Sequence, residues 1–258
     1  MRIKNIMINS ISISALVLLA LALSGCASFD KVAAEKRLSA ANQEKVQSSG
    51  APLEKPFKLG ILLDLETADS SGEYHRNWSW DDYEKNMVVS YADSLVKEGS
   101  VSEYFFIPEG DMPLQDLNAA MKKAAENKAD ALLTVRGVIN VNKYINPIGI
   151  LDPTIIGALV LPGSNMDVTI LVHLDLWDLK NQKPLISLKS EGMQKDFGTT
   201  LFIRTNSANT ENAVSDVKID TLRKMLIDFK KKFAGIRFMA VPPPYPKSEQ
   251  LPGLQGGK

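Results

Sequence analysis

Runs in which hydrophobic and polar residues alternate predict the strands of this protein. In Phe57–Leu65 the alternating apolar positions have mostly apolar neighbours, which is typical of a strand covered on both faces. Ala131–Tyr144 is apolar on one side only, and we expect its other side to face water. Four polar residues mark that second side: Thr134, Arg136, Asn140 and Asn142. Similar runs predict further strands over Ser102–Ile107, Asp167–Leu179 and Pro184–Gln194.

Apolar residues that recur every three or four positions predict three helices. The first covers Asp81–Lys97 and ends before Gly99, and the second begins near Asp111 and Pro113. The third and longest covers Glu211–Phe233. We expect the first helix to bury a stripe made of Tyr83, Met87, Tyr91 and Leu95. The longest helix turns seven apolar residues inward: Val214, Val217, Leu222, Met225, Leu226, Phe229 and Phe233.

The resulting order, β-α-β-α-β-β-β-α, predicts an α/β fold with a mixed sheet. Helices connect the first three strands, so we expect these strands to be parallel, with right-handed crossovers. The later strands follow one another closely, and Lys180–Lys183 is a plausible hairpin connection between two of them. The sequence therefore predicts a parallel first half, an antiparallel meander, and a final helix that packs back on the sheet.

The N-terminus has the pattern of a bacterial secretion signal. Arg2 and Lys4 precede an apolar run, Ile11–Leu23, which is shorter than the ~20 residues that a membrane-spanning helix needs. Small residues follow this run and lead to Cys26, the only cysteine of the chain. A single thiol excludes an internal disulfide framework. We therefore expect cleavage after Gly25, which would remove residues 1–25.

Leu23-Ser24-Gly25-Cys26 resembles the lipobox of bacterial lipoproteins. That resemblance implies a diacylglycerol thioether on Cys26 and an acylated amine, so the chain would be held in a membrane by its lipid. Two or more acyl chains give stable anchoring where one does not. Ala27 follows the cysteine where an aspartate would signal retention in the inner membrane. The resemblance thus implies attachment to the outer membrane, facing the periplasm.

Composition divides the remaining chain into three parts. Residues 26–56 are polar and predict a flexible tether, with a frayed helix over Phe29–Val46 as an alternative within it. We expect residues 57–238 to form a single periplasmic domain and residues 239–258, which are rich in proline and glycine, to form a disordered tail. Without residues 1–25 the chain has 28 basic and 30 acidic residues, because Arg2 and Lys4 are removed. A net charge of −2 gives no drive toward nucleic acid.

The middle of the chain carries a second resemblance. The order of elements resembles that of periplasmic lipoproteins built on the α/β domain found in the N-terminal part of TolB and in curli-secretion proteins. Pro153–Ala158, Gly163, Val168–Val172 and Asp175–Asp178 are similar to the middle of the rhombotail lipoproteins. This resemblance implies a fold and a location. It offers no catalytic residues to transfer.

Catalytic and metal-binding patterns are sparse. His173 and Asp175 share one face of a predicted strand and could form a general-base pair, but no Gly-x-Ser-x-Gly motif accompanies them. We instead expect a half-buried histidine beside a solvent-facing carboxylate. Asp64, Glu66 and Asp69 could hold calcium, but they lack the spacing of a calcium loop, and we expect a solvated turn there. We expect no metal site, no cofactor and no enzymatic activity.

The segment Ile145–Pro162 is the strongest candidate interface. It connects two strands and is nearly uncharged, whereas connections are usually polar and exposed. We rank packing against the domain first, a protein interface second and contact with lipid third. Trp78 belongs to an aromatic cluster that is a second candidate recognition surface, although we expect Trp80 and Tyr83 to be buried. The candidate interface residues are Ile148, Ile150, Leu151, Ile155, Ile156, Leu159, Val160, Leu161 and Trp78.

These patterns predict an accessory or assembly lipoprotein that binds an unidentified protein partner at the cell envelope. The alternative is an oligomeric subunit of an outer-membrane secretion or transport channel, so a homo-oligomer stays open. An envelope hydrolase that uses His173 ranks third.

Overall fold

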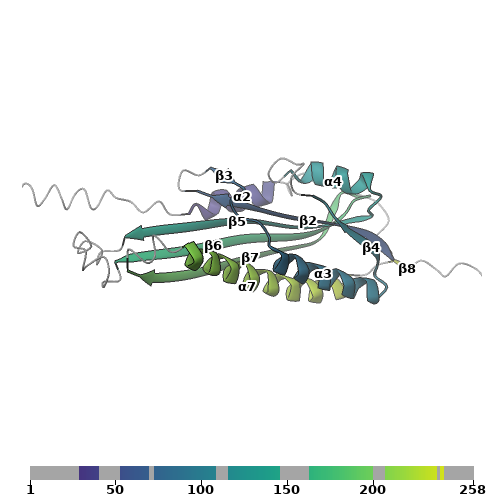
Figure 1. Ribbon diagram of the computed structural model, residues 1–258. Coiled ribbons are helices and arrows are strands. Elements are labelled where there is room, and N and C mark those ends of the chain that lie inside the picture. Colours follow the sequence, from purple (N-terminus) through teal and green to yellow (C-terminus); the bar gives the residue numbers. More distant parts are fainter. Residues whose placement is uncertain are drawn as a thin grey trace, which may run out of the picture.

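We describe the protein from a computed structural model. The described residues are 29–40, 53–69, 73–108, 116–145, 163–199, 207–236 and 239–240. Most of them form a six-stranded mixed sheet with helices on both sides (Figure 1), and two short strands form a separate pair. Its strands are β2 (Phe57–Ala68), β3 (Tyr74–His75), β4 (Val101–Phe106), β5 (Ala131–Ile145), β6 (Ser164–Asp178) and β7 (Lys183–Gly198). The helices are α2 (Lys31–Ala40), α3 (Asp82–Lys97), α4 (Leu117–Glu126) and α7 (Ser207–Ala234).

The predicted strand directions are confirmed. β2 pairs in parallel with β4 on one edge and with β5 on the other. β5, β6 and β7 form an antiparallel meander, with a tight turn between β6 and β7. β3 adds a short antiparallel pair at the end of β2. The α/β fold class, the parallel first half and the packing of α7 on the sheet are therefore as predicted.

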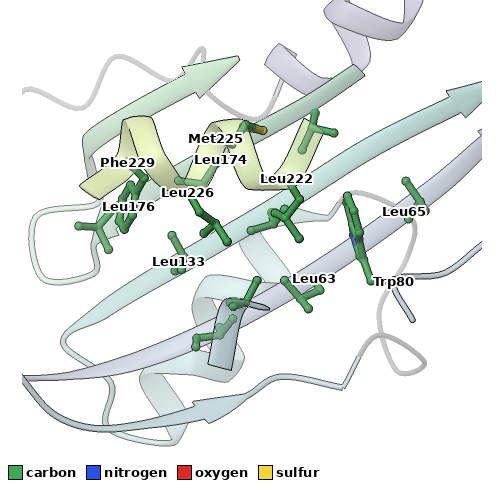
Figure 2. Close-up of a cluster of buried hydrophobic side chains, with 14 of the residues drawn as sticks. Leu63, Leu65, Trp80, Leu133, Leu174, Leu176, Leu222, Met225, Leu226 and Phe229 are labelled. Atoms are coloured by element: carbon green, nitrogen blue, oxygen red, sulfur yellow. The ribbon is translucent and has the colours of Figure 1, made fainter. Parts of the chain in front are cut away.

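One face of the sheet carries the main apolar core, which α3 and α7 cover (Figure 1). All seven residues predicted to point inward from the longest helix are buried. In Figure 2, Leu222 and Leu226 of α7 lie above strand residues such as Leu133, and Trp80 lies at one end of the cluster. Fully burying one such side chain contributes about 1.5–3 kcal/mol, so this face supplies most of the hydrophobic stabilisation.

The predicted stripe of α3 is shifted by one residue. Tyr83 is 58% exposed, so its expected burial is wrong, whereas Trp80 is fully buried as expected. The observed stripe is Glu84, Val88, Ala92 and Leu95, with Met87 and Tyr91 packed at its side. The helix starts where the Asp81 backbone N–H donates to Glu84 Oε2 (3.1 Å), and this bond turns Glu84 toward the protein.

The opposite face, expected to be wet along β5, is covered. Thr134 and Arg136 are fully buried, and Asn140 is buried too, so the prediction for this face is wrong. α4 packs over an apolar cluster around Leu132. α2 packs over a second cluster, in which its Ala34 and Leu38 are fully buried.

Within the predicted flexible tether, residues 26–56, the described helix α2 is packed on the sheet. The predicted frayed helix is present, but it is shorter, at Lys31–Ala40, and it is fixed to the sheet. At the other end of the chain, β8 (Met239–Ala240) pairs in parallel with β1 (Glu54–Lys55), so the first two residues assigned to the tail have a partner strand. Within the described residues no helix is long and apolar enough to span a bilayer.

Candidate functional site

A row of polar residues crosses the face of the sheet that α2 and α4 cover. The strand register places Asp64 opposite Arg136, Arg136 opposite His173, and His173 opposite Lys189. Asp175 lies two residues further along β6, on the same face as His173. We call these five residues the polar belt. It separates the apolar cluster under α4 from the one under α2.

The centre of the polar belt is a buried ion pair. Arg136 Nη2 lies 3.1 Å from Asp175 Oδ2, and both side chains are 0% exposed. Ser187 Oγ donates a hydrogen bond to the other oxygen, Asp175 Oδ1, at 2.5 Å. Two buried charges are tolerated because each neutralises the other, and removing either one would leave an uncompensated charge. Asp175 is therefore bound by Arg136 and Ser187. The prediction that its carboxylate faces solvent is wrong.

His173 is buried rather than half-buried, so that part of its prediction is wrong. Within the described residues its Nδ1 has no hydrogen-bond partner. Burial, together with the charges of Lys189 and Arg136, lowers the pKa of His173 to about 4. The imidazole is thus neutral at pH 7, and a base with so low a pKa abstracts protons weakly. His173 and Asp175 lie on one face of the sheet, as predicted. The partners of Asp175 are Arg136 and Ser187.

The two acidic residues inside β2 differ from their prediction as part of a solvated turn. Asp64 and Glu66 lie inside the strand and are buried. Arg37 of α2 donates to both oxygens of Glu66, at 2.6 and 3.0 Å, and this interaction raises the pKa of Arg37. Arg76 Nη2 lies 3.5 Å from Asp64 Oδ1. These carboxylates have arginine partners, so their chemistry here is that of ion pairs.

The hairpin between β2 and β3 brings together Asp69, Glu73 and His75, whose ligating atoms all lie within 4.8 Å of one another. His75 Nε2 is 3.3 Å from Asp69 Oδ2 and 3.6 Å from Glu73 Oε2. All three residues are exposed. The turn itself explains part of the arrangement, because the Glu73 backbone N–H donates to Asp69 Oδ1 at 2.9 Å.

Lys218 is a buried cation that the sequence analysis missed. Its Nζ donates to the Ser79 carbonyl oxygen (2.9 Å) and to Asp81 Oδ2 (2.5 Å), and it lies 3.2 Å from Glu84 Oε1. These bonds tie α7 to the start of α3. The signal was present in the sequence, because Lys218 falls among the apolar positions of the helix stripe. Beside it, a surface hollow is lined by residues that include the half-buried Trp78.

The end of the sheet farthest from the β6–β7 turn exposes apolar side chains. Ile145 pairs with Ser164, which in turn pairs with Gly198. Ile145 is 47% exposed, Met193 48% and Phe197 79%. We call Ile145, Met193 and Phe197 the apolar end. The candidate interface residues between 148 and 161 lie outside the described residues, as do Gly25 and Cys26; Trp78 is inside them.

No protein-family model matches the chain, and no curated protein matches it significantly. Among solved structures, a homolog of a neuraminyllactose-binding hemagglutinin from Helicobacter pylori is 12% identical; the match covers 71% of this chain and 87% of that one, with a TM-score of 0.34. The LpoB C-terminal domain from Salmonella enterica is 12% identical; the match covers 63% of this chain and 98% of that one, with a TM-score of 0.28.

Lipoprotein GNA1162 from Neisseria meningitidis is 15% identical, and its match covers 70% of this chain and all of that one, with a TM-score of 0.27. The matched structures thus include a bacterial lipoprotein. All three TM-scores lie below 0.5.

Proposed function

We propose that this protein is an accessory lipoprotein of the bacterial envelope, held in the outer membrane by lipid on Cys26, and that it acts by binding a protein partner without catalysis. The observation that carries the proposal is the apolar end, whose residue Ile145 leads directly into the nearly uncharged connection 146–162.

The apolar end combines the features of a binding surface. Phe197 is an aromatic side chain held on a regular strand while almost wholly exposed. Met193 lies on the same strand and the same face as Phe197, whereas Ile145, at the end of β5, points to the opposite face of the sheet. Removing apolar surface from water gains roughly 25 cal/mol per Å², and buried aromatic residues supply much of the energy of protein interfaces. Contact with a partner would therefore relieve the cost of exposing these residues.

The polar belt supports a structural role in place of catalysis. The Asp175 carboxylate accepts from Arg136 and Ser187, and the neutral His173 has little capacity as a base at pH 7. A hydrolase would need a nucleophile hydrogen-bonded to its base. The Ser187 hydroxyl instead donates a hydrogen bond to the carboxylate of Asp175, whose charge Arg136 already neutralises.

A photocrosslinking amino acid at position 197, introduced into the full chain in cells, tests the proposal. We expect a discrete crosslinked band that contains a protein other than this chain and is recovered from the envelope fraction. The matched control is the same amino acid at Ile227, which is 51% exposed on α7, away from the apolar end. Equal crosslinking from both positions, or none from position 197, would contradict the proposal. A ladder of bands made of this chain alone would favour the channel-subunit alternative.

A further inference from the structure

β7 has an outer edge to which no other described strand is paired. Among the described residues it is the last strand of the sheet, and β6 pairs with it along its whole length. The Leu179 backbone N–H donates to the Asp130 carbonyl oxygen, and this bond continues the β5–β6 ladder. In an antiparallel ladder every second residue bonds to the same neighbour. Odd-numbered residues of β6 therefore face β5, and even-numbered ones face β7.

It follows that even-numbered residues of β7 bond to β6, while odd-numbered residues direct their backbone groups outward. One of these outward carbonyl oxygens, that of Ser187, accepts from Lys232 Nζ at 3.2 Å, so a side chain of α7 already occupies this position of the edge. Beyond Ser187 the outward residues are Lys189, Glu191, Met193, Lys195 and Phe197, and all five side chains are exposed. Such an edge is a template for pairing with another strand.

The charges along this edge are complementary to themselves. We infer that residues 189–197 of β7 pair antiparallel with the same residues of a second copy, around a two-fold axis at Met193. Each Glu191 then faces Lys195 of the partner, each Lys189 faces Phe197 of the partner, and the two Met193 side chains meet. Two opposite-charge pairs and two cation–aromatic pairs result from a single register.

Neighbouring registers fit less well. A shift of the axis to Gly192 places Lys189 opposite Lys195 of the partner, and an axis at Glu191 brings two carboxylates together. An axis at Ser190 restores opposite charges, but it needs the backbone of Ser187, which Lys232 already covers. Glu191 also contacts Lys31 of its own chain, which leaves its second carboxylate oxygen for the partner.

Charge reversal tests this register on purified full-length protein in detergent, with the molecular mass measured by sedimentation. Glu191→Lys and Lys195→Glu each place like charges opposite one another, and we expect each to raise the dimer Kd by at least about tenfold. The double variant Glu191→Lys/Lys195→Glu restores opposite charges, so its Kd returns to near that of the parent chain. Lys183→Glu, on the same strand outside the paired residues, is the control and leaves the dimer unchanged.

A disulfide test fixes the axis independently. Directly opposite residues in an antiparallel pair have Cα atoms about 5.5 Å apart, which suits a disulfide. In a chain whose own thiol is removed by Cys26→Ser, Met193→Cys gives an oxidised dimer and Lys183→Cys does not. A purified parent chain that stays monomeric, or single and double charge variants with the same Kd, would overturn the inference. Met193 and Phe197 also belong to the apolar end, so a different protein bound there would compete with this dimer. These readouts use the purified chain, so they test the dimer in the absence of such a protein.

Discussion

The two faces of the sheet are both buried, but different physics holds them. The face under α3 and α7 is a continuous apolar core, in which strand leucines meet the stripe of α7. The face under α2 and α4 has two small apolar clusters with the polar belt between them. On the first face, stability depends on the close packing of apolar side chains. On the second it depends on the pairing of charges, because an unpaired buried charge costs more than a lost methyl group.

We expect the largest change in the free energy of unfolding from a substitution at Arg136. Arg136→Met leaves the fully buried Asp175 without its cation, and we expect a loss of about 3–5 kcal/mol in the free energy of unfolding. Urea unfolding followed by circular dichroism measures this loss. The double variant Arg136→Met/Asp175→Leu removes both charges, so it recovers most of that loss. If the double variant is as unstable as the single one, the pairing of charges is not what holds this face.

On the apolar face, Leu174→Ala creates a cavity in the core of Figure 2. We expect a loss of about 2–5 kcal/mol, measured in the same way. Leu188→Ala, at a half-buried position of β7 opposite Leu174, is the control and costs less. A cost below 1 kcal/mol at Leu174 would contradict the view that this face depends on filled volume.

His173 makes the stability of the second face depend on pH in the acidic range. Its folded-state pKa of about 4 lies below the ordinary value of 6.5, so the unfolded chain binds the proton more readily. Stability is therefore fully present above about pH 6.5 and falls as the pH decreases toward 4. From pH 7 to pH 5 we expect a loss of about 2 kcal/mol. This loss is reduced in His173→Leu, which is tested by urea unfolding at both pH values; an unchanged pH dependence would exclude this role.

The smallest effect concerns Tyr83 and tests the register of α3. Because Tyr83 is largely exposed, Tyr83→Ala changes the free energy of unfolding by less than about 0.5 kcal/mol. Val88→Ala, in the buried stripe, costs more. The reverse order, in a comparison of thermal unfolding midpoints, would place Tyr83 in the core as the apolar spacing had predicted.

The apolar face could be predicted from the sequence because periodicity reports which positions avoid water. That principle gave the inward residues of α7, the strand directions and the order of the elements. It failed for the second face because Thr134 and Arg136 are polar and yet buried. A signal was available, since Leu132 and Val138 share their side of β5 and are apolar.

The candidate site was less accessible to sequence reasoning than the fold. The pairing of Arg136 with Asp175, and of Arg37 with Glu66, joins residues that are far apart in the chain, so local spacing does not reveal it. Whether Tyr83 or Glu84 faces the core is also decided by a distant partner, because Lys218 of α7 draws Glu84 inward. The apolar character of the connection after β5 could be read directly from the sequence.

The mass of the mature N-terminus tests our central proposal most directly, because attachment to the envelope depends on it. Mass spectrometry of the protein extracted from membranes with detergent measures that mass. We predict a chain that begins at Cys26 and carries acyl chains on its thiol and amine, and a Cys26→Ser chain that keeps residues 1–25. A parent chain recovered without lipid and with residues 1–25 intact would contradict the proposal.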